Sequence, residues 1–476
     1  MVFINNETQR VPFFNQLMNE ANKNQEVGKK LGFVTLSTLP LCFLVTIVHI
    51  PPTAGPLFNG YPFVAVWNAP INICENNQVT LDFAPFAAVT TPQKIKDQEL
   101  TLFYSDRLGL YPNVNETTKQ EFYGGIPQKG DSAAHLKKAK NDIAYYIPST
   151  ASPGLAVIDW EAWRPLWDRN WNSKAIYRTL SIIYTKQLND SLSPQQTIAE
   201  AKEQFQTAAR NYMADTLALG LKDRPQELWG YYLFPNCYNY EYKDVSKPYT
   251  GKCSPQVQSQ NDQLIWLWEK STALYPSVYL STLLKESYKA ALFVRNCVQE
   301  AMRVAALPKH SFTAPVYVYN RPVFVDSNKQ FLNENDLINT IGESAAVGAS
   351  GVILWGASAD YDDKASCEAL SRYLPSTLNP YIVNVTAAAK LCSDMLCQGN
   401  GRCVRKNYDS NDYLHLNPAN FKIQRGSNGK YFAVGMTSSA DLTIFMNKFT
   451  CRCYAGKSCK ANLPASFPQT PTVINI

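Results

Sequence analysis

Short apolar runs of strand length alternate with longer polar segments along most of this chain. The apolar runs occupy residues 63–67, 100–104, 155–159, 228–234, 275–279, 315–319 and 351–355. Segments of helical composition lie between them, such as residues 193–219 and 333–347. Strands that alternate with helices predict a parallel α/β fold, and about seven such units predict a closed, TIM-like barrel.

The run at residues 155–159 leads directly into two acids, Asp159 and Glu161. Strand side chains alternate between faces, so these two acids share a face, with Cα atoms roughly 6.5 Å apart, and Trp160 faces the other way. Two neighbouring carboxylates repel, which raises the pKa of one of them and keeps a protonated general acid available. The alternative is a strand end that exposes two solvated acids. The tryptophans nearby favour a sugar-binding site; they are Trp160, Trp163, Trp167 and Trp171.

The N-terminal region resembles a targeting segment. Lys29 and Lys30 precede a largely apolar run at residues 31–50, which is long enough for a signal peptide or a signal anchor. Pro40 and the small residues after the run favour cleavage, so we expect residues 1–55 to be removed. The C-terminus lacks the long apolar tail of a lipid-anchor signal.

Cysteines and glycosylation motifs both indicate the secretory route. The chain has 12 cysteines, which is typical of an oxidising compartment. Sequons occur at Asn115, Asn189 and Asn384, although any single sequon can arise by chance.

The composition changes after about residue 390, where a cysteine-rich segment begins. Six cysteines between residues 391 and 462 predict a small disulfide-stapled module, because so short a segment buries little core by itself. Their spacing resembles an EGF-like knot with a long insertion between the third and fourth cysteines. A zinc site is the alternative, but His415 is the only histidine nearby. We therefore expect a catalytic domain at residues 56–390, this module at 391–462, and a flexible tail at 463–476.

Charge and histidine content argue against several other functions. The net charge of +6, from 45 basic and 39 acidic residues, is too small and too dispersed for a nucleic-acid-binding protein. The four histidines form neither a metal-ligand spacing nor a catalytic triad, and the glycines form no phosphate-binding loop. No metal and no organic cofactor is expected.

Many long motifs, in order, resemble the vertebrate hyaluronidases of glycoside hydrolase family 56, both sperm-surface and lysosomal types. The resemblance covers residues 58–459 and is carried by FVAVWNAP, LTLFYSDRLGLYP, GGIPQ, GLAVIDWEAWRPLWDRNW, LWGYYLFPNCYNY, NDQLIWLW, ALYPSVY, GESAAVGASGVILWG and NPYIVNVT. It implies a distorted barrel with a long cleft, and hydrolysis of the N-acetylhexosaminide bonds of hyaluronan.

The resemblance also implies a retaining, substrate-assisted mechanism. Glu161 would protonate the leaving oxygen and then activate water. The acetamido oxygen of the substrate would act as the nucleophile, and Asp159 would hold the acetamido N–H and stabilise its developing positive charge.

Four aromatic residues match positions that contact substrate in the family. Tyr232 and Tyr279 correspond to tyrosines that orient the acetamido group. Tyr104 and Trp355 correspond to cleft residues, with Trp355 stacked under the reacting sugar. Packing in the core is the alternative for an isolated aromatic residue on a strand.

The family's disulfide pattern, transferred to this chain, uses ten cysteines. The implied pairs are Cys74–Cys367, Cys237–Cys253, Cys392–Cys403, Cys397–Cys451 and Cys453–Cys459. Cys42, in the targeting segment, and Cys297 remain unpaired.

Cys297 departs from the family, where an arginine is thought to meet the substrate carboxylate. Loss of such a charge-assisted contact costs about 1.5–3 kcal/mol in general. Arg295, two residues earlier, could replace it if the backbone allows its side chain to reach. Cys297 could also be a small buried residue without a role, or it could shift specificity towards chondroitin.

These observations predict a secreted or lysosomal endo-β-N-acetylhexosaminidase that acts on hyaluronan, with chondroitin as a second substrate. We expect a monomer, without a permanent membrane anchor unless the N-terminal segment stays uncleaved. The competing hypothesis is a glycan-binding or adhesion protein that keeps the cleft and has lost turnover.

Overall fold

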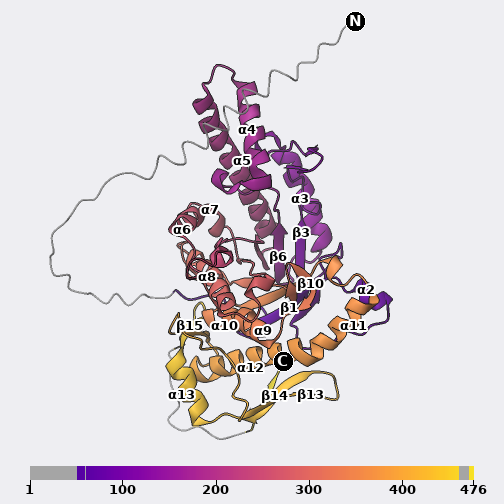
Figure 1. Ribbon diagram of the computed structural model, residues 1–476, viewed down its shortest axis with the longest axis vertical. Helices are drawn as coiled ribbons and strands as arrows, with labels where there is room; N and C mark the ends of the chain where they lie inside the picture. The colour runs from indigo at the N-terminus through magenta and orange to yellow at the C-terminus, as the bar shows by residue number, and fades with distance from the viewer. Residues whose placement is uncertain (1–50, 59, 460–470) are drawn as a thin grey trace, which may run out of the picture.

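Two parallel sheets form the centre of the molecule in the computed structural model, which describes residues 51–58, 60–459 and 471–476. One sheet has the strand order β2-β1-β11-β8 and the other has the order β3-β6-β7. Their bounds are β1 Val64–Asn68, β2 Ala88–Thr90, β3 Leu100–Tyr104, β6 Gly154–Asp159, β7 Glu227–Tyr231, β8 Tyr317–Asn320 and β11 Gly351–Trp355. The expected parallel, TIM-like barrel is therefore present (Figure 1).

The segment 274–277 joins the two sheets without forming a regular strand. Isolated parallel bridges connect Tyr275 to Tyr232 beyond β7, and Leu274 to Val316 before β8. The strand expected at 275–279 is therefore replaced by single bridges, because Pro276 has no N–H to donate to a ladder. The short strand β2 was not expected from the sequence.

Alternation along the strands separates the inside of the barrel from the layer beneath the helices. In β6, Leu155 and Val157 belong to the cluster inside the barrel, whereas Ala156 and Ile158 belong to the larger outer core. All four side chains are fully buried. This two-sided burial explains why the strand is apolar throughout.

Helices surround the barrel, and a long helical hairpin projects from one end of the molecule (Figure 1). Ser193 caps α5 with a capping box that includes Gln196, and Asn333 caps α9 in the same way. The longer helices are α3 Ser132–Tyr146, α4 Ala175–Leu188, α5 Pro194–Asp223, α8 Tyr288–Ala305, α11 Lys364–Tyr373, α12 Asn379–Leu396 and α13 Ser439–Lys448. The short ones are α2 Asn72–Asn76, α6 Pro255–Asp262, α7 Ile265–Trp268, α9 Glu334–Leu337 and α10 Glu343–Val347. Of the described helices, none is both long and apolar enough to cross a membrane.

The C-terminal segment is less separate than the cysteine spacing predicted. The expected boundary at 390/391 falls inside α12, a continuous and mostly buried helix. The insertion between Cys403 and Cys451 is itself folded into β13 Phe421–Arg425, β14 Tyr431–Met436 and α13. These elements lie beside α12 at the end of the molecule opposite the helical hairpin (Figure 1).

The two chain ends also differ from expectation. Residues 463–476 were expected to be flexible, but β16 Pro471–Asn475 pairs with the free edge of β14 and buries Ile474. The boundary at 55/56 was placed too late, because Thr53 is buried and bridges both Thr313 and Tyr454. The folded region therefore begins by residue 51, and the apolar run at 31–50, with Cys42, lies outside the described residues.

Among the described residues, five disulfides are present, in the same pairs that the resemblance implies. They are Cys74–Cys367, Cys237–Cys253, Cys392–Cys403, Cys397–Cys451 and Cys453–Cys459. The first spans 293 residues and ties α2 to α11, so it links the beginning of the barrel to its end. Cys297 is buried and unpaired.

The remaining short strands are β4 Asn113–Val114, β5 Glu121–Phe122, β9 Val323–Phe324, β10 Ser327–Phe331, β12 Gly401–Arg405 and β15 Phe449–Cys453.

Candidate active site

Asp159 and Glu161 lie at the carboxyl end of the barrel, where β6 ends. Asp159 is the last residue of the strand and continues the inward-facing series of Leu155 and Val157. A hydrogen bond between their side chains joins Asp159 to Glu161. Trp160 points into the outer core and stacks on Tyr111 at 4.6 Å. The two acids therefore share one side of the chain, where active sites of barrels collect.

The electrostatic environment distinguishes the two acids. Burial, followed by repulsion from the Glu161 carboxylate, raises the pKa of Asp159 well above its usual range, and Arg164 only partly opposes this. Glu161 is more accessible, with 50% of its side chain exposed. The sequence predicted that repulsion would raise one pKa, and the structure assigns the raised pKa to the acid at the strand end.

Two basic residues that the sequence reading missed hold the loop around Glu161. Arg164 Nη2 lies 3.4 Å from Glu161 Oε2, and Nη1 of the same side chain donates to the Glu161 carbonyl at 2.8 Å. Lys174 donates to the Glu161 and Ala162 carbonyls. Both residues follow the Asp-x-Glu motif, at three and thirteen positions beyond Glu161. A basic residue so soon after a candidate catalytic acid is the sequence signal that could have found them.

Tyr104 and Trp355 meet across the mouth of the barrel, although they are 251 positions apart. They end β3 and β11, and Trp355 Nε1 donates to the Tyr104 hydroxyl at 3.1 Å. Burial raises the pKa of Tyr104 to about 12, so this hydroxyl is neutral and can accept the bond. Tyr279 stacks on Trp355 with ring centroids 5.8 Å apart and planes at 14°.

A buried ion pair supports this stacked aromatic pair. The Arg321 guanidinium lies 5.4 Å from the Trp355 ring and 5.9 Å from the Tyr279 ring. Arg321 Nη2 binds both oxygens of Asp360, at 2.6 and 2.7 Å. Arg321 directly follows β8, and the sequence analysis did not single it out, because an isolated arginine after a strand carries no distinctive pattern.

Tyr232 occupies the position directly beyond β7. Its hydroxyl donates to Ser277 Oγ at 3.2 Å, and its ring lies 6.3 Å from that of Tyr279. Burial, and then the charges of Glu161 and Asp159, raise the pKa of Tyr232 far above its usual value. Both tyrosines are therefore neutral donors next to the two acids.

Cys297 and Arg295, the two α8 residues singled out from the sequence, point in different directions. Cys297 is buried, and its Sγ contacts Asn239 Oδ1 at 3.3 Å in the loop after β7. Burial raises the pKa of the thiol to about 12, so it carries no charge. The loop that it contacts lies beside the site.

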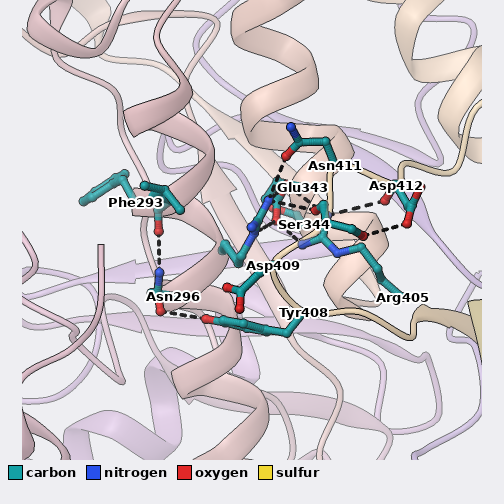
Figure 2. Close-up of polar contacts among 12 residues, drawn as sticks. Phe293, Asn296, Glu343, Ser344, Arg405, Tyr408, Asp409, Asn411 and Asp412 are labelled. Atoms are coloured by element: carbon teal, nitrogen blue, oxygen red, sulfur yellow. Dashed lines mark hydrogen bonds and ion pairs between the residues drawn. The ribbon is translucent and has the colours of Figure 1, made fainter. Parts of the chain in front are cut away.

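Arg295 cannot replace the missing arginine, so that expectation was wrong. Residues two apart on a helix lie about 200° apart around the axis. Arg295 is fully buried and its Nε bonds Glu343 Oε1 at 2.6 Å, and Arg405 binds the same carboxylate from the C-terminal segment. Figure 2 shows Glu343 and Arg405 at this junction, which is a structural contact between the barrel and the C-terminal segment.

The three sequons lie in different surroundings. Asn115 and Asn189 are exposed, and each accepts backbone hydrogen bonds within a tight turn. Asn384 lies inside α12, half-buried, and its Oδ1 accepts the Leu416 N–H at 2.8 Å. In the folded protein, Asn115 and Asn189 are therefore more accessible to glycosylation than Asn384.

Comparison with known proteins matches this chain to one family. The model of the hyaluronidase family, glycoside hydrolase family 56, matches residues 52–463. Mouse hyaluronidase-5 is 46% identical over 438 residues, covering 91% of this chain and 82% of the relative. Human hyaluronidase PH-20 is 44% identical over 429 residues, covering 90% of this chain and 82% of the relative.

Solved structures agree with the sequence comparison. A crystal structure of bee venom hyaluronidase matches with a TM-score of 0.59 and 28% identity, over 67% of this chain and 99% of the other. The same protein in complex with a hyaluronic acid tetramer also matches with a TM-score of 0.59. The parallel barrel, with two acids at its carboxyl end, therefore defines this protein as a glycosidase. The chain belongs to the hyaluronidase family.

Proposed function

We propose that this protein hydrolyses internal N-acetylhexosaminide bonds of hyaluronan with retention of configuration. The observation that carries the proposal is the hydrogen-bonded pair of Asp159 and Glu161 at the end of one strand. Two acids placed side by side cannot flank a sugar from opposite faces, as a two-carboxylate mechanism with an enzymic nucleophile requires. The relative crystallised with a hyaluronic acid tetramer supports the substrate class.

In the proposed mechanism, Glu161 gives a proton to the leaving oxygen while the C1–O bond breaks. The acetamido carbonyl oxygen forms a new bond to C1, which produces an oxazolinium ring. Asp159 holds the proton of the pair before reaction, because its pKa is raised. Transfer of that proton through Glu161 leaves Asp159 negative beside the positive ring. Glu161 then takes a proton from water, which attacks C1 and opens the ring, and this proton returns to Asp159 to restore the starting pair.

The aromatic residues would bind and orient the substrate. Tyr232 and Tyr279 are neutral donors next to the acids and would orient the acetamido group. Trp355, stacked on Tyr279 and linked to Tyr104, would support the reacting sugar. Arg164 would hold the Glu161 carboxyl in position.

Chondroitin is a second candidate substrate, and Cys297 is the observation that favours it. The neutral thiol presents no positive charge to a substrate carboxylate at this point of α8. Chondroitin, like hyaluronan, alternates a uronic acid with an N-acetylhexosamine, so the same two acids would serve its epimeric hexosamine. We further propose a monomer that passes through the secretory pathway to an extracellular or lysosomal location, with its N-terminal segment removed before residue 51 and its C-terminal cysteine segment EGF-like in origin.

Chain shortening of hyaluronan and of unsulfated chondroitin would test the proposal. The purified protein from residue 51 onward would be assayed across roughly pH 3.5–7.5, where a perturbed carboxyl titrates. Hyaluronan should be cleaved, and Glu161→Gln should lose about 10²–10⁴-fold in rate while keeping its fold. Cleavage of neither polymer by folded protein would contradict the proposal and favour a glycan-binding role.

A further inference from the structure

The loop 237–253 lies beside the candidate active site. It follows Tyr232 and is closed by the Cys237–Cys253 disulfide. The Tyr238 ring packs 5.0 Å from that of Trp171, and the Arg164 guanidinium lies close enough to Tyr240 to lower its pKa against the effect of burial. Tyr240 and Trp171 remain 45% and 42% exposed, as residues that contact a sugar chain must be.

Direct hydrogen bonds fasten this loop to α8. Asn239 Nδ2 donates to the Phe293 carbonyl of α8 at 3.1 Å, and Asn239 Oδ1 lies 3.3 Å from Cys297 Sγ of the same helix. A bond from Asn239 Nδ2 to the Gly251 carbonyl, at 2.6 Å, holds the two sides of the loop together. Gly251 has φ of +71°, and a Cβ there would lie 2.4 Å from the Leu292 carbonyl oxygen. The contact is therefore too close for any side chain, and the loop position depends on the surface of α8.

Asn296 connects this contact to the C-terminal segment. Its Nδ2 donates to the Leu292 carbonyl at 2.8 Å and lies 3.4 Å from the Thr250 carbonyl. Its Oδ1 accepts the Tyr408 hydroxyl at 2.6 Å (Figure 2). Asn296 is buried, so its amide orientation is set by these partners.

The segment that carries Tyr408 is held firmly. Arg405 binds the buried Glu343 carboxylate (Figure 2), and Arg295 Nη2 donates to the Ser410 carbonyl at 3.1 Å. Asp412 is paired with Lys448 at 2.8 Å, which ties the segment to α13. Tyr408 is therefore a fixed point from which a hydrogen bond can orient Asn296.

We propose that Tyr408 is a positioning residue for substrate binding, acting through Asn296 on the loop 237–253. The inference rests on the proposed function, because the aromatic residues of the loop are taken to contact hyaluronan. The C-terminal segment would thereby contribute to the affinity for substrate and not to the chemical step.

Tyr408→Phe removes only the hydroxyl, and Tyr431→Phe is its matched control. The Tyr431 hydroxyl also joins the C-terminal segment to the barrel region, by donating to Asp82 Oδ2 at 3.0 Å, but it has no contact with the loop. In Tyr408→Phe we expect KM for hyaluronan to rise about three- to tenfold, while kcat stays within about twofold of the wild type. This is the pattern for the loss of an interaction that stabilises the bound substrate and the transition state equally. Tyr431→Phe should leave both constants unchanged, even if it lowers stability to the same extent.

A double-mutant cycle sharpens the test. Once Asn296 is changed to Ala, Tyr408→Phe should have no further effect on KM, because the side chains act through one contact. An unchanged KM in Tyr408→Phe, an equal rise in Tyr431→Phe, or additive effects in the double mutant would each overturn the proposal.

Hydrogen exchange separates this inference from the proposed function. Backbone amides of residues 237–253 should exchange faster in Tyr408→Phe and not in Tyr431→Phe. If the wild-type protein cleaved neither polymer, the proposed function would fail while exchange still reported on the loop. Equal exchange of the loop in the wild type and Tyr408→Phe would refute the positioning role by itself.

Discussion

Two regions of this protein bury carboxyl groups and treat their negative charge in opposite ways. At the mouth of the barrel, Asp159 has a second acid, Glu161, as its neighbour, and its pKa is strongly raised. At the junction with the C-terminal segment, Glu343 is fully buried and lies between Arg295 and Arg405. Burial is common to both regions, and the sign of the neighbouring charge differs.

This difference teaches which buried acid can do chemistry. Glu343 lies between two fixed cations, which compensate its negative charge and make it part of the packing between the barrel and the C-terminal segment. Asp159 is held next to another acid, and the repulsion, which Arg164 only partly offsets, is relieved further by a proton or by a positive group such as an oxazolinium ring. A perturbed acid at the carboxyl end of a barrel strand, where the active sites of barrels collect, is therefore the candidate for chemistry.

The largest expected effect is that of Asp159→Asn on catalysis. We expect the rate of hyaluronan cleavage to fall by about 10²–10⁴-fold, because the amide cannot become the anion that stabilises the ring.

The stability of Asp159→Asn should change in the opposite sense to its activity. The folded state of the wild type binds more protons than the unfolded state above the ordinary pKa of Asp, so its stability falls as pH rises through the raised pKa.

The amide does not titrate, so the variant should be more stable than the wild type at neutral pH. Chemical denaturation at about pH 4 and pH 7 would measure this. Equal pH dependence in the two proteins would show that the Asp159 carboxyl is not perturbed.

Glu343→Gln should instead destabilise the fold. Removing the carboxylate leaves two buried guanidinium groups without their counter-charge, which costs about 3–5 kcal/mol in general. The matched control is Asp394→Asn, which breaks the exposed Lys390–Asp394 pair and should cost less than about 0.5 kcal/mol. Urea denaturation would measure both, and similar costs would mean that the Arg295–Glu343–Arg405 cluster contributes little.

Glu227 provides a test of burial without function. It starts β7, at the end of the strand away from the site, and burial raises its pKa to about 8. Its folded state therefore binds more protons than the unfolded state between about pH 4.5 and pH 8, and stability is lost across that window.

Glu227→Gln should raise stability at pH 8, by roughly 1–3 kcal/mol, without loss of turnover. Thermal unfolding from pH 5 to 8 and a cleavage assay would measure the two effects. Loss of turnover in this variant would break the distinction between the acid of the site and other buried acids.

Cys297 should give the smallest effect. A buried neutral thiol with a pKa of about 12 has little thiolate at pH 8 and should resist alkylation in the folded protein. Cys297→Ser, which keeps a group able to bond Asn239, should change stability by less than about 1 kcal/mol. Mass spectrometry after iodoacetamide treatment would measure the first effect, and rapid modification of the native protein would contradict the buried environment.

Local pattern was sufficient to place the acids. Side-chain alternation along β6 turns Asp159 inward, and Glu161, two residues beyond the strand, lies on the same side of the chain as the alternation predicted. Composition predicted a helix from Ser193, the residue that caps α5 in the structure, and the apolar runs predicted most strands of the barrel. The five cysteine pairs came from family resemblance, since spacing alone leaves many connectivities open.

Long-range packing decided the remaining features. Arg295 and Cys297 are two residues apart, but helix geometry sends one to Glu343 and the other to Asn239. The bridges at 274–277, the burial of Thr53 and the pairing of β16 depend on edges contributed by distant segments.

Local pattern and family resemblance together predicted the barrel class, the candidate Asp-x-Glu motif and the family of this protein. Three features depend on the tertiary structure: which acid has the raised pKa, where Arg295 points, and how the C-terminal segment reaches the loop beside the site. The physical reason is that strand and helix periodicity act over a few residues. Desolvation and charge pairing depend instead on groups brought together from far apart in the chain.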